Sequence, residues 1–152
     1  MYNSCVTLLD SNHYQVFLFC CPANIPFNFA MHFWFVYNEK GKISRWETLF
    51  RKRCKNHLFV NFFPPFSGVG VWPFFDKWTW KAKLIYKTEG KLAKQMIDFI
   101  KTSQRKYPYC YQYFSLGPNS NTYIQWVLNH FPAFKAKLPW NAFGKNYKRG
   151  PG

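Results

Sequence analysis

The stretch FAMHFWFVYNEKGKISRWETLF, residues 29–50, holds two aromatic and apolar runs on either side of the polar segment NEKG. Aromatic and β-branched residues favour strands, and a short Gly-containing segment between two such runs is typical of a β-hairpin. We therefore predict strands over residues 29–37 and 43–50, joined by a turn at residues 38–41. This hairpin decides the fold class because it begins an antiparallel sheet.

The register of the hairpin determines which side chains meet across its two strands. Pairing that is symmetrical about the turn sets His32 opposite Glu47. It also sets Trp34 opposite Arg45. A bulge at Gly41 would shift this register by one residue, which would move the side chains of one strand to the other face.

The rest of the chain adds further strands and then helices. Strands are also predicted over residues 14–21, 57–63 and 78–88, and an irregular loop rich in Phe and Trp is predicted from Pro64 to Pro73. Apolar residues with a helical period predict helices over residues 89–106 and 120–130. Strands therefore precede helices, which indicates an α+β domain whose mostly antiparallel sheet packs against two or three helices. We expect residues 1–152 to form a single domain.

The composition combines a folded core with a strongly basic surface. Hydrophobic residues make up 48% of the 152 residues, and 21 Lys plus Arg against 6 Asp plus Glu give a formal net charge of +15. Such a surface attracts phosphate groups, anionic lipids and acidic polymers. The charge predicts affinity for an anionic partner, but it does not assign a function.

The cysteines and the apolar segments indicate the cellular compartment of the protein and whether it crosses a membrane. The five cysteines form no CxxC pair and show no metal-ligand spacing with His, so we expect no metal site, no cofactor and a reducing compartment. The N-terminal residues lack a basic leader, and the apolar stretch 16–37 is interrupted by Pro, Asn and His. We predict a soluble cytoplasmic protein without a transmembrane segment, with peripheral membrane contact as an alternative.

Several short motifs lie between residues 29 and 147. They are His32-Phe33-Trp34, Glu47, Tyr107-Pro108, GPNSNTYIQW at 117–126, LPW at 138–140 and AFGKNY at 142–147. Together they resemble the bacterial family of domains of unknown function numbered 3750, and GPNSNT is the most specific part. The order of elements also resembles circularly permuted papain-like proteins of the NlpC type. In those proteins the nucleophile that opens a helix is usually Cys, whereas the matching residue here is Ser120.

This resemblance, together with the chemistry of the residues, predicts an acyl-transfer site. Ser120 would be the nucleophile, His32 the base that takes its proton, and Glu47 the group that orients the base. Backbone N–H groups of Ser120 and Asn121 at the helix N-terminus would stabilise an oxyanion. The predicted binding residues are Asn119, Asn121, Trp34, Tyr113 and Lys145.

Each catalytic candidate also has an ordinary structural interpretation. Ser120 could cap its helix, His32 could be a buried histidine with a satisfied hydrogen bond, and Glu47 could pair with Arg45. Two functions therefore remain open. The first is a papain-like hydrolase or acyltransferase acting on an amide, ester or thioester of a small molecule, peptide or lipid. The alternative is a catalytically inactive module that binds an anionic ligand, a membrane surface or nucleic acid through its basic surface and the aromatic loop 62–80.

Overall fold

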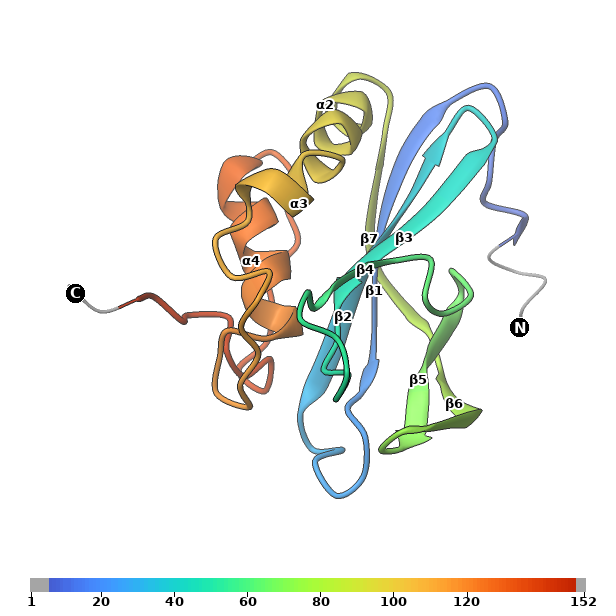
Figure 1. Cartoon of the computed structure of the whole chain (residues 1–152). Coiled ribbons are helices and arrows are strands. Elements are labelled where there is room, and N and C mark those ends of the chain that lie inside the picture. Colours follow the sequence, from blue (N-terminus) through green and yellow to red (C-terminus); the bar gives the residue numbers. More distant parts are fainter. Residues whose placement is uncertain (1–5, 150–152) are drawn as a thin grey trace.

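A five-stranded antiparallel sheet forms the centre of the computed structural model, which describes residues 6–149 (Figure 1). Its strand order is β4-β3-β2-β1-β7, and a separate two-stranded sheet pairs β5 with β6. The strands are β1 (Tyr14–Pro22), β2 (Met31–Glu39), β3 (Lys42–Thr48), β4 (Leu58–Val60), β5 (Ser67–Trp72), β6 (Phe75–Lys81) and β7 (Lys83–Glu89). The helices are α2 (Lys91–Ile100), α3 (Ser103–Lys106) and α4 (Ser120–His130). The expected α+β class with a mostly antiparallel sheet is confirmed.

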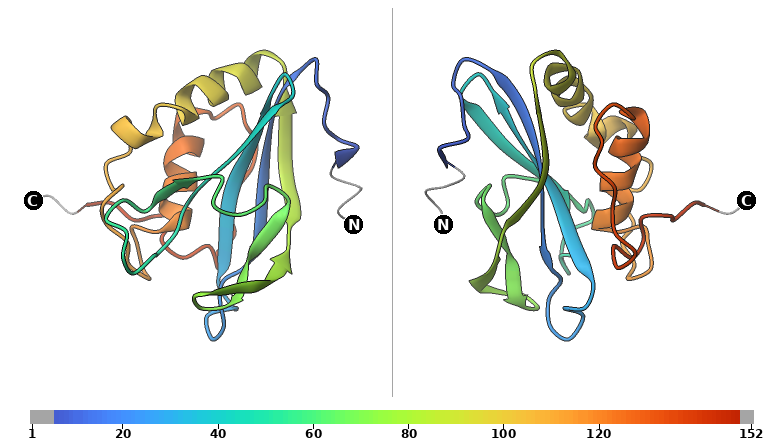
Figure 2. Two further views of the ribbon diagram at one scale, coloured as in Figure 1. Left: turned by 45° about the vertical axis from the view of Figure 1, so that its right-hand side comes forward. Right: turned by 180° about the vertical axis from the view of Figure 1, so that it is seen from behind.

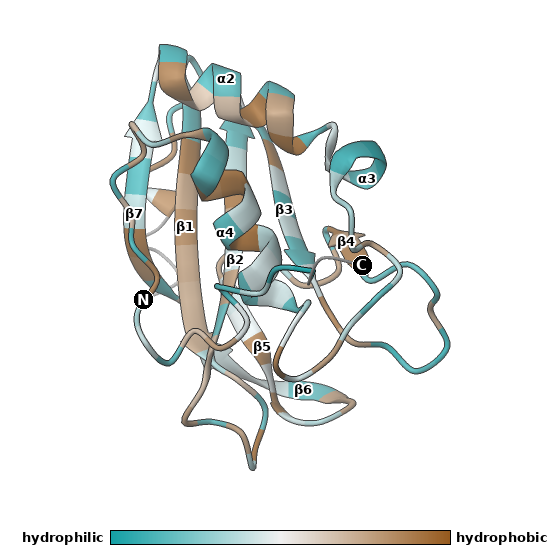
Figure 3. Cartoon of the chain, turned by 90° about the vertical axis from the view of Figure 1, so that its left-hand side faces the viewer, coloured by the Kyte–Doolittle hydropathy of each residue, from teal (hydrophilic) through white to brown (hydrophobic). Residues whose placement is uncertain are grey.

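The large sheet separates two hydrophobic clusters. Helices α2 and α4 lie on one face and the β5–β6 hairpin lies on the other (Figure 2). On β1, Val16 and Leu18 belong to the cluster on the helical face, whereas Phe17 and Phe19 belong to the cluster beneath the hairpin. Because both faces are covered, β1 is hydrophobic along most of its length (Figure 3).

The hairpin register differs from the predicted one by two residues. A two-residue turn joins β2 to β3, so Val36 rather than Trp34 faces Arg45. Lys40 and Gly41 both have positive φ, 49° and 96°, as the tight primed turns of hairpins require. The predicted four-residue turn was therefore wrong. A shift of two residues leaves every side chain on its original face, so the expected meeting of His32 and Glu47 survives.

Other boundaries also differ from the prediction. The predicted strand 78–88 is two strands, because β6 ends in the small sheet and β7 begins in the large one. The predicted loop from Pro64 to Pro73 contains β5, and the strand expected at 57–63 is only β4. The helix expected at 89–106 is interrupted before α3, where Thr102 Oγ1 donates to the carbonyl of Phe99 at 2.7 Å.

The helix predicted at residues 120–130 is confirmed as α4, and it carries the N-terminus around which the candidate site is built. Within residues 6–149, no helix combines the length and hydrophobicity needed to cross a bilayer.

The turn between β2 and β3 gives a test of the observed register. Lys40→Asn should raise the free energy of unfolding by about 0.5 kcal/mol, because Asn tolerates positive φ better than Lys. Gly41→Ala should lower it by about 1 to 2 kcal/mol for the opposite reason. Urea unfolding of the two variants measures both changes. Equal stability of Gly41→Ala and wild type would contradict the two-residue turn.

Candidate functional site

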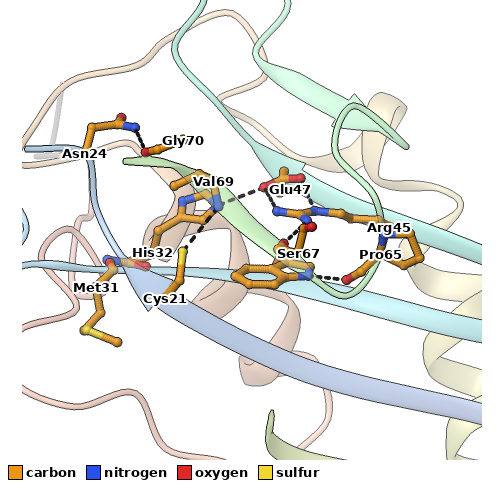
Figure 4. A network of polar contacts seen from close by, with 12 residues as sticks. Cys21, Asn24, Met31, His32, Arg45, Glu47, Pro65, Ser67, Val69 and Gly70 are labelled. Atoms are coloured by element: carbon orange, nitrogen blue, oxygen red, sulfur yellow. Dashed lines mark hydrogen bonds and ion pairs between the residues drawn. The ribbon is translucent and has the colours of Figure 1, made fainter. Parts of the chain in front are cut away.

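A buried ionic network lies on the face of β2 and β3 that looks toward the β5–β6 hairpin (Figure 4). Glu47 Oε1 lies 2.8 Å from His32 Nε2 and 2.8 Å from Arg45 Nη2, and Glu47 Oε2 accepts a hydrogen bond from Arg45 Nε. Arg45 and Glu47 are 0% and 1% exposed. Glu47 therefore pairs with Arg45, as its structural interpretation predicts, and also contacts the candidate base.

Arg45 makes further contacts that compensate for the energetic cost of burying its charge. Its Nη1 donates to the carbonyls of Pro64 at 2.7 Å and Ser67 at 2.5 Å. Its guanidinium lies over the ring of Trp34, 4.2 Å from the centroid, and Trp34 Nε1 donates to the carbonyl of Pro65 at 3.0 Å. The network therefore ties the segment that leads into β5 to the large sheet.

The charge state of Glu47 fixes the role of the His32 ring. Burial alone would raise the pKa of Glu47, but the Arg45 guanidinium and the His32 contact outweigh it and hold that pKa below its usual value. An ionised carboxylate only accepts hydrogen bonds, so His32 Nε2 carries the hydrogen of their contact. In the neutral ring, Nδ1 is then the nitrogen with a free lone pair.

The N-terminus of α4 is capped by Asn119 and not by Ser120. Asn119 Oδ1 accepts from the backbone N–H groups of Asn121 at 3.0 Å and Thr122 at 3.3 Å. Thr122 Oγ1 in turn accepts from the Asn119 N–H at 3.0 Å, which completes a capping box. The structural interpretation of Ser120 as the cap is therefore wrong. Its hydroxyl occupies the first turn of α4 without serving as the cap.

Two further amides attach this helix start to the sheet. Asn121 Nδ2 donates to the carbonyls of Met31 at 2.8 Å and Phe143 at 3.0 Å, and Asn119 Nδ2 also donates to Phe143 at 3.0 Å. Gly144 has a φ of 89°, and a Cβ at this position would collide with the side chain of Asn119. The GPNSNT and AFGKNY motifs therefore form one hydrogen-bonded unit that sets Ser120 beside the start of β2.

Ser120 and His32 line the same cavity, whose volume is about 450 Å³. The cavity also contacts Asn119, Asn121 and Tyr113. Most of its remaining wall is apolar and includes Phe27, Phe29, Met31, Leu49, Phe50 and Phe74. Within the described chain no hydrogen bond joins Ser120 to His32, and such contacts commonly form only once a substrate is bound.

Tyr113 lies beside Ser120 in the wall of the cavity. Its hydroxyl contacts both the Ser120 hydroxyl and the Ser120 backbone N–H. Burial raises the pKa of Tyr113 and the contacts with Ser120 only partly oppose this, so the phenol is protonated at neutral pH. The N–H of Asn121, predicted as an oxyanion donor, instead donates to the Asn119 cap. The hydroxyl of Tyr113 and the N–H of Ser120 are thus the donors adjacent to the candidate nucleophile.

Two predicted binding residues lie outside the cavity. Trp34 is fully buried beneath Arg45, and Lys145 Nζ donates to the carbonyl of Leu138 at 2.8 Å. Sequence reasoning offered the pairing of Arg45 with Glu47 as a structural alternative, but it did not predict that Arg45 also bonds the carbonyls of Pro64 and Ser67. Its spacing of two residues from Glu47 was a signal, because both side chains must leave a strand on the same face.

The described residues also bear on metal binding and on disulfide formation. Among residues 6–149, no three or more His, Cys, Asp or Glu side chains are arranged to hold a metal ion. The described cysteines, Cys20, Cys21, Cys54 and Cys110, are all free thiols.

Comparison with known proteins assigns the chain to a family. The family model described as "Protein of unknown function (DUF3750)" matches residues 14–147, so the chain belongs to this family. No curated protein and no solved structure matches the chain.

The buried network predicts a specific dependence of stability on pH. Because the pKa of folded Glu47 lies below its usual value of 4.5, its stabilising contribution is complete above that pH and is lost as the pH falls through the folded-state pKa. Glu47→Gln leaves Arg45 buried without a counter-charge, so it should cost about 3 kcal/mol at neutral pH. Chemical denaturation should show this difference narrowing below pH 4.5.

Asp98→Asn is the matched control for this experiment, because Asp98 pairs with Lys94 on the exposed face of α2. It should leave stability nearly unchanged at every pH. A Glu47→Gln difference that stays constant from neutral to acid pH would contradict an ionised, paired Glu47.

The capping geometry predicts unequal effects of two adjacent substitutions. Asn119→Ala should lower the free energy of unfolding by about 3 kcal/mol, because it removes the cap and the bonds to the 143–144 segment. Ser120→Ala should lower it by about 1 kcal/mol or less, because only the contact with Tyr113 is lost. Thermal or urea unfolding separates the two, and a larger effect at Ser120 would show that the cap is misassigned.

Proposed function

We propose that this DUF3750 protein is a serine hydrolase or acyltransferase with a permuted papain-like (NlpC-type) architecture, which acts on an ester, thioester or amide. One observation carries the proposal. Ser120, at the start of α4, and His32, hydrogen-bonded to the buried Glu47, line one cavity of about 450 Å³. A nucleophile, a base and a group that orients the base are the parts that acyl transfer requires.

In the proposed reaction, Ser120 Oγ attacks the carbonyl carbon of the substrate while His32 Nδ1 accepts the hydroxyl proton. Glu47 stays ionised and stabilises the imidazolium through Nε2. The tetrahedral intermediate collapses, the bond to the leaving group breaks, and His32 returns its proton to that group. Water then cleaves the acyl-serine in a hydrolase, or an alcohol or amine takes the acyl group in a transferase.

Tyr113 and the backbone of Ser120 are the proposed oxyanion donors. The phenol of Tyr113 is protonated at neutral pH and the Ser120 N–H lies at a helix N-terminus, where the helix dipole favours negative charge. Both groups contact each other in the free protein. A carbonyl oxygen bound at Ser120 would therefore take the place of this mutual contact.

The order of the elements supports the permuted papain-like proposal. The candidate base is on β2, the candidate acid is on the adjacent β3, and the candidate nucleophile opens the later helix α4. A hydroxyl is a weaker acid than a thiol, so Ser120 depends more strongly on a base that is positioned beforehand. The hydrogen bond from His32 to Glu47 supplies that positioning, and Arg45 in turn donates to the same carboxylate.

The lining of the cavity narrows the proposed substrate. Apolar side chains surround Ser120 and His32, and the charged pair Arg51–Asp76 lies among them, with its atoms 3.3 Å apart. An apolar cavity favours a hydrophobic acyl group by removing its surface from water. We place the protein in the cytoplasm, in keeping with the free thiols of its described cysteines.

A second candidate function is that of a binding module, which holds a ligand in the same cavity without converting it to a product. The observation that favours it is the contact of the Ser120 hydroxyl with Tyr113 in place of His32. If the protein has this function, the cavity holds an apolar ligand. Replacing Ser120 then changes only the affinity for that ligand, because there is no reaction rate to change.

Labelling with an alkyl fluorophosphonate, which forms a covalent bond with activated serines, tests the proposal. Wild type should be modified at Ser120 in a time-dependent manner, and His32→Gln should slow the reaction by about a hundredfold. Ser115→Ala is the matched control, since Ser115 lines the same cavity, and it should leave labelling unchanged. Failure of folded wild type to react, or equal reaction of Ser120→Ala, would refute catalysis and favour the second candidate.

A further inference from the structure

Exposed aromatic side chains lie on and next to the wall of the cavity: Phe27, Phe29 and Phe74 line it, and Trp140 packs edge-on against Phe143, which also lines it. They lie in the β1–β2 connection, at the turn between β5 and β6, and in the segment that follows α4. We call them the aromatic rim: Phe27, Phe29, Trp72, Phe74 and Trp140. Each is at least 46% exposed, although such side chains are normally buried. Aromatic residues that gather from three segments at one site mark an interaction surface.

Hydrogen bonds hold these three segments together at one end of the molecule. The Ile25 N–H donates to the carbonyl of Val71 at 2.9 Å, which joins the β1–β2 connection to β5. Asn141 Nδ2 donates to the carbonyl of Phe29 at 3.2 Å, which joins that connection to the segment after α4. The β1–β2 connection and the β5–β6 turn extend together at the lower end in Figures 1 and 2.

Phe74 occupies its position at a conformational cost. It lies in the turn between β5 and β6 with a φ of 57°, a value that Gly or Asn adopts far more readily than an aromatic residue. Its side chain is 60% exposed, so burial in the core does not compensate for this strain. The fold therefore does not explain an aromatic residue at this tip, whereas a surface that inserts into an apolar environment does.

Four of the six acidic residues lie at the opposite end of the molecule from the rim. Glu39 and Glu89 face Tyr14 and Gln15 at the start of β1, which is the opposite end of the sheet. Asp10 and Asp98 are near the same end, through their contacts with Gln15 and α2. The remaining two acids are Glu47, which is buried, and Asp76, which is paired with Arg51. No unpaired acidic side chain therefore lies near the rim among residues 6–149.

Basic residues flank the aromatic rim. Phe50 packs edge-on against Phe74, with ring centroids 6.3 Å apart, and the exposed basic residues Lys52 and Arg53 follow it in the chain. Lys77 is exposed on β6. The end of the molecule that carries the aromatic rim therefore combines apolar tips with positive charge.

We propose that the aromatic rim docks on an anionic lipid bilayer, with its rings in the interfacial region and the flanking basic residues on the headgroups. Aromatic side chains partition into this region, and basic residues are attracted to anionic headgroups. The apolar lining of the cavity matches acyl chains. The proposal does not rest on catalysis by Ser120. It places the cavity next to lipid in either case.

Vesicle flotation tests the docking surface directly. Wild type should float with vesicles of equimolar phosphatidylglycerol and phosphatidylcholine, and not with pure phosphatidylcholine. Phe74→Gly should weaken binding about fivefold, because an inserted ring is lost. The same substitution relieves the positive φ, so its melting temperature should equal or exceed that of wild type. Unchanged binding of this folded variant would overturn the proposal.

Two double variants with the same net charge distinguish binding through the rim from a general attraction between the positively charged protein and anionic lipid. Lys52→Gln with Arg53→Gln should reduce binding about tenfold, whereas Lys42→Gln with Lys91→Gln, at the other end of the sheet, should reduce it less than about twofold. Equal losses would mean that the net charge alone binds lipid, which overturns a specific surface. Tighter binding to duplex DNA or RNA, unaffected by Phe74→Gly, would also overturn it.

Ser120→Ala separates this proposal from the catalytic one. It should abolish fluorophosphonate labelling and leave vesicle binding unchanged, since Ser120 is buried behind the rim. Loss of vesicle binding in this variant would contradict a docking surface formed by the rim.

Discussion

The buried guanidinium of Arg45 is the constraint on which both the second layer and the candidate site depend. A charge removed from water must have its hydrogen bonds satisfied, and Arg45 achieves this with Glu47 and with the carbonyls of Pro64 and Ser67. The same carboxylate orients His32. The contacts that attach the β5–β6 hairpin to the large sheet are therefore also the contacts that position the candidate base.

Three adjacent residues at the start of α4 have different roles. Asn119 caps the helix, Asn121 attaches it to Met31 and Phe143, and Ser120 lies between them with its hydroxyl beside Tyr113 and the cavity. Most of the GPNSNT motif therefore has a structural explanation. Ser120 is the exception, because the cap and the anchor are complete without it. This division supports the proposal that Ser120 is kept for chemistry or for ligand contact.

Sequence reasoning predicted the parts that depend on local periodicity and alternation. The hairpin, α4 and the shared face of His32 and Glu47 followed from these patterns, and the contact survived a register error of two residues because side chains in strands repeat every two residues. The split of residues 78–88 between two sheets was missed because the alternation continues across Ala82. The apolar part of the cavity wall was also missed, since residues such as Phe27, Phe74 and Phe143 meet only through tertiary contacts.

The central claim is that His32, held by Glu47, acts on residue 120. The Ser120→Cys variant allows this claim to be tested without a known substrate. Iodoacetamide reacts with the thiolate, so the rate of alkylation at different pH values gives the pKa of the introduced thiol. The pH profile of alkylation at residue 120, followed by peptide mass spectrometry, should give a thiol pKa about one to two units below its usual value, and adding His32→Gln should remove this shift. A thiol at residue 120 with an unshifted pKa, insensitive to His32, would contradict the account.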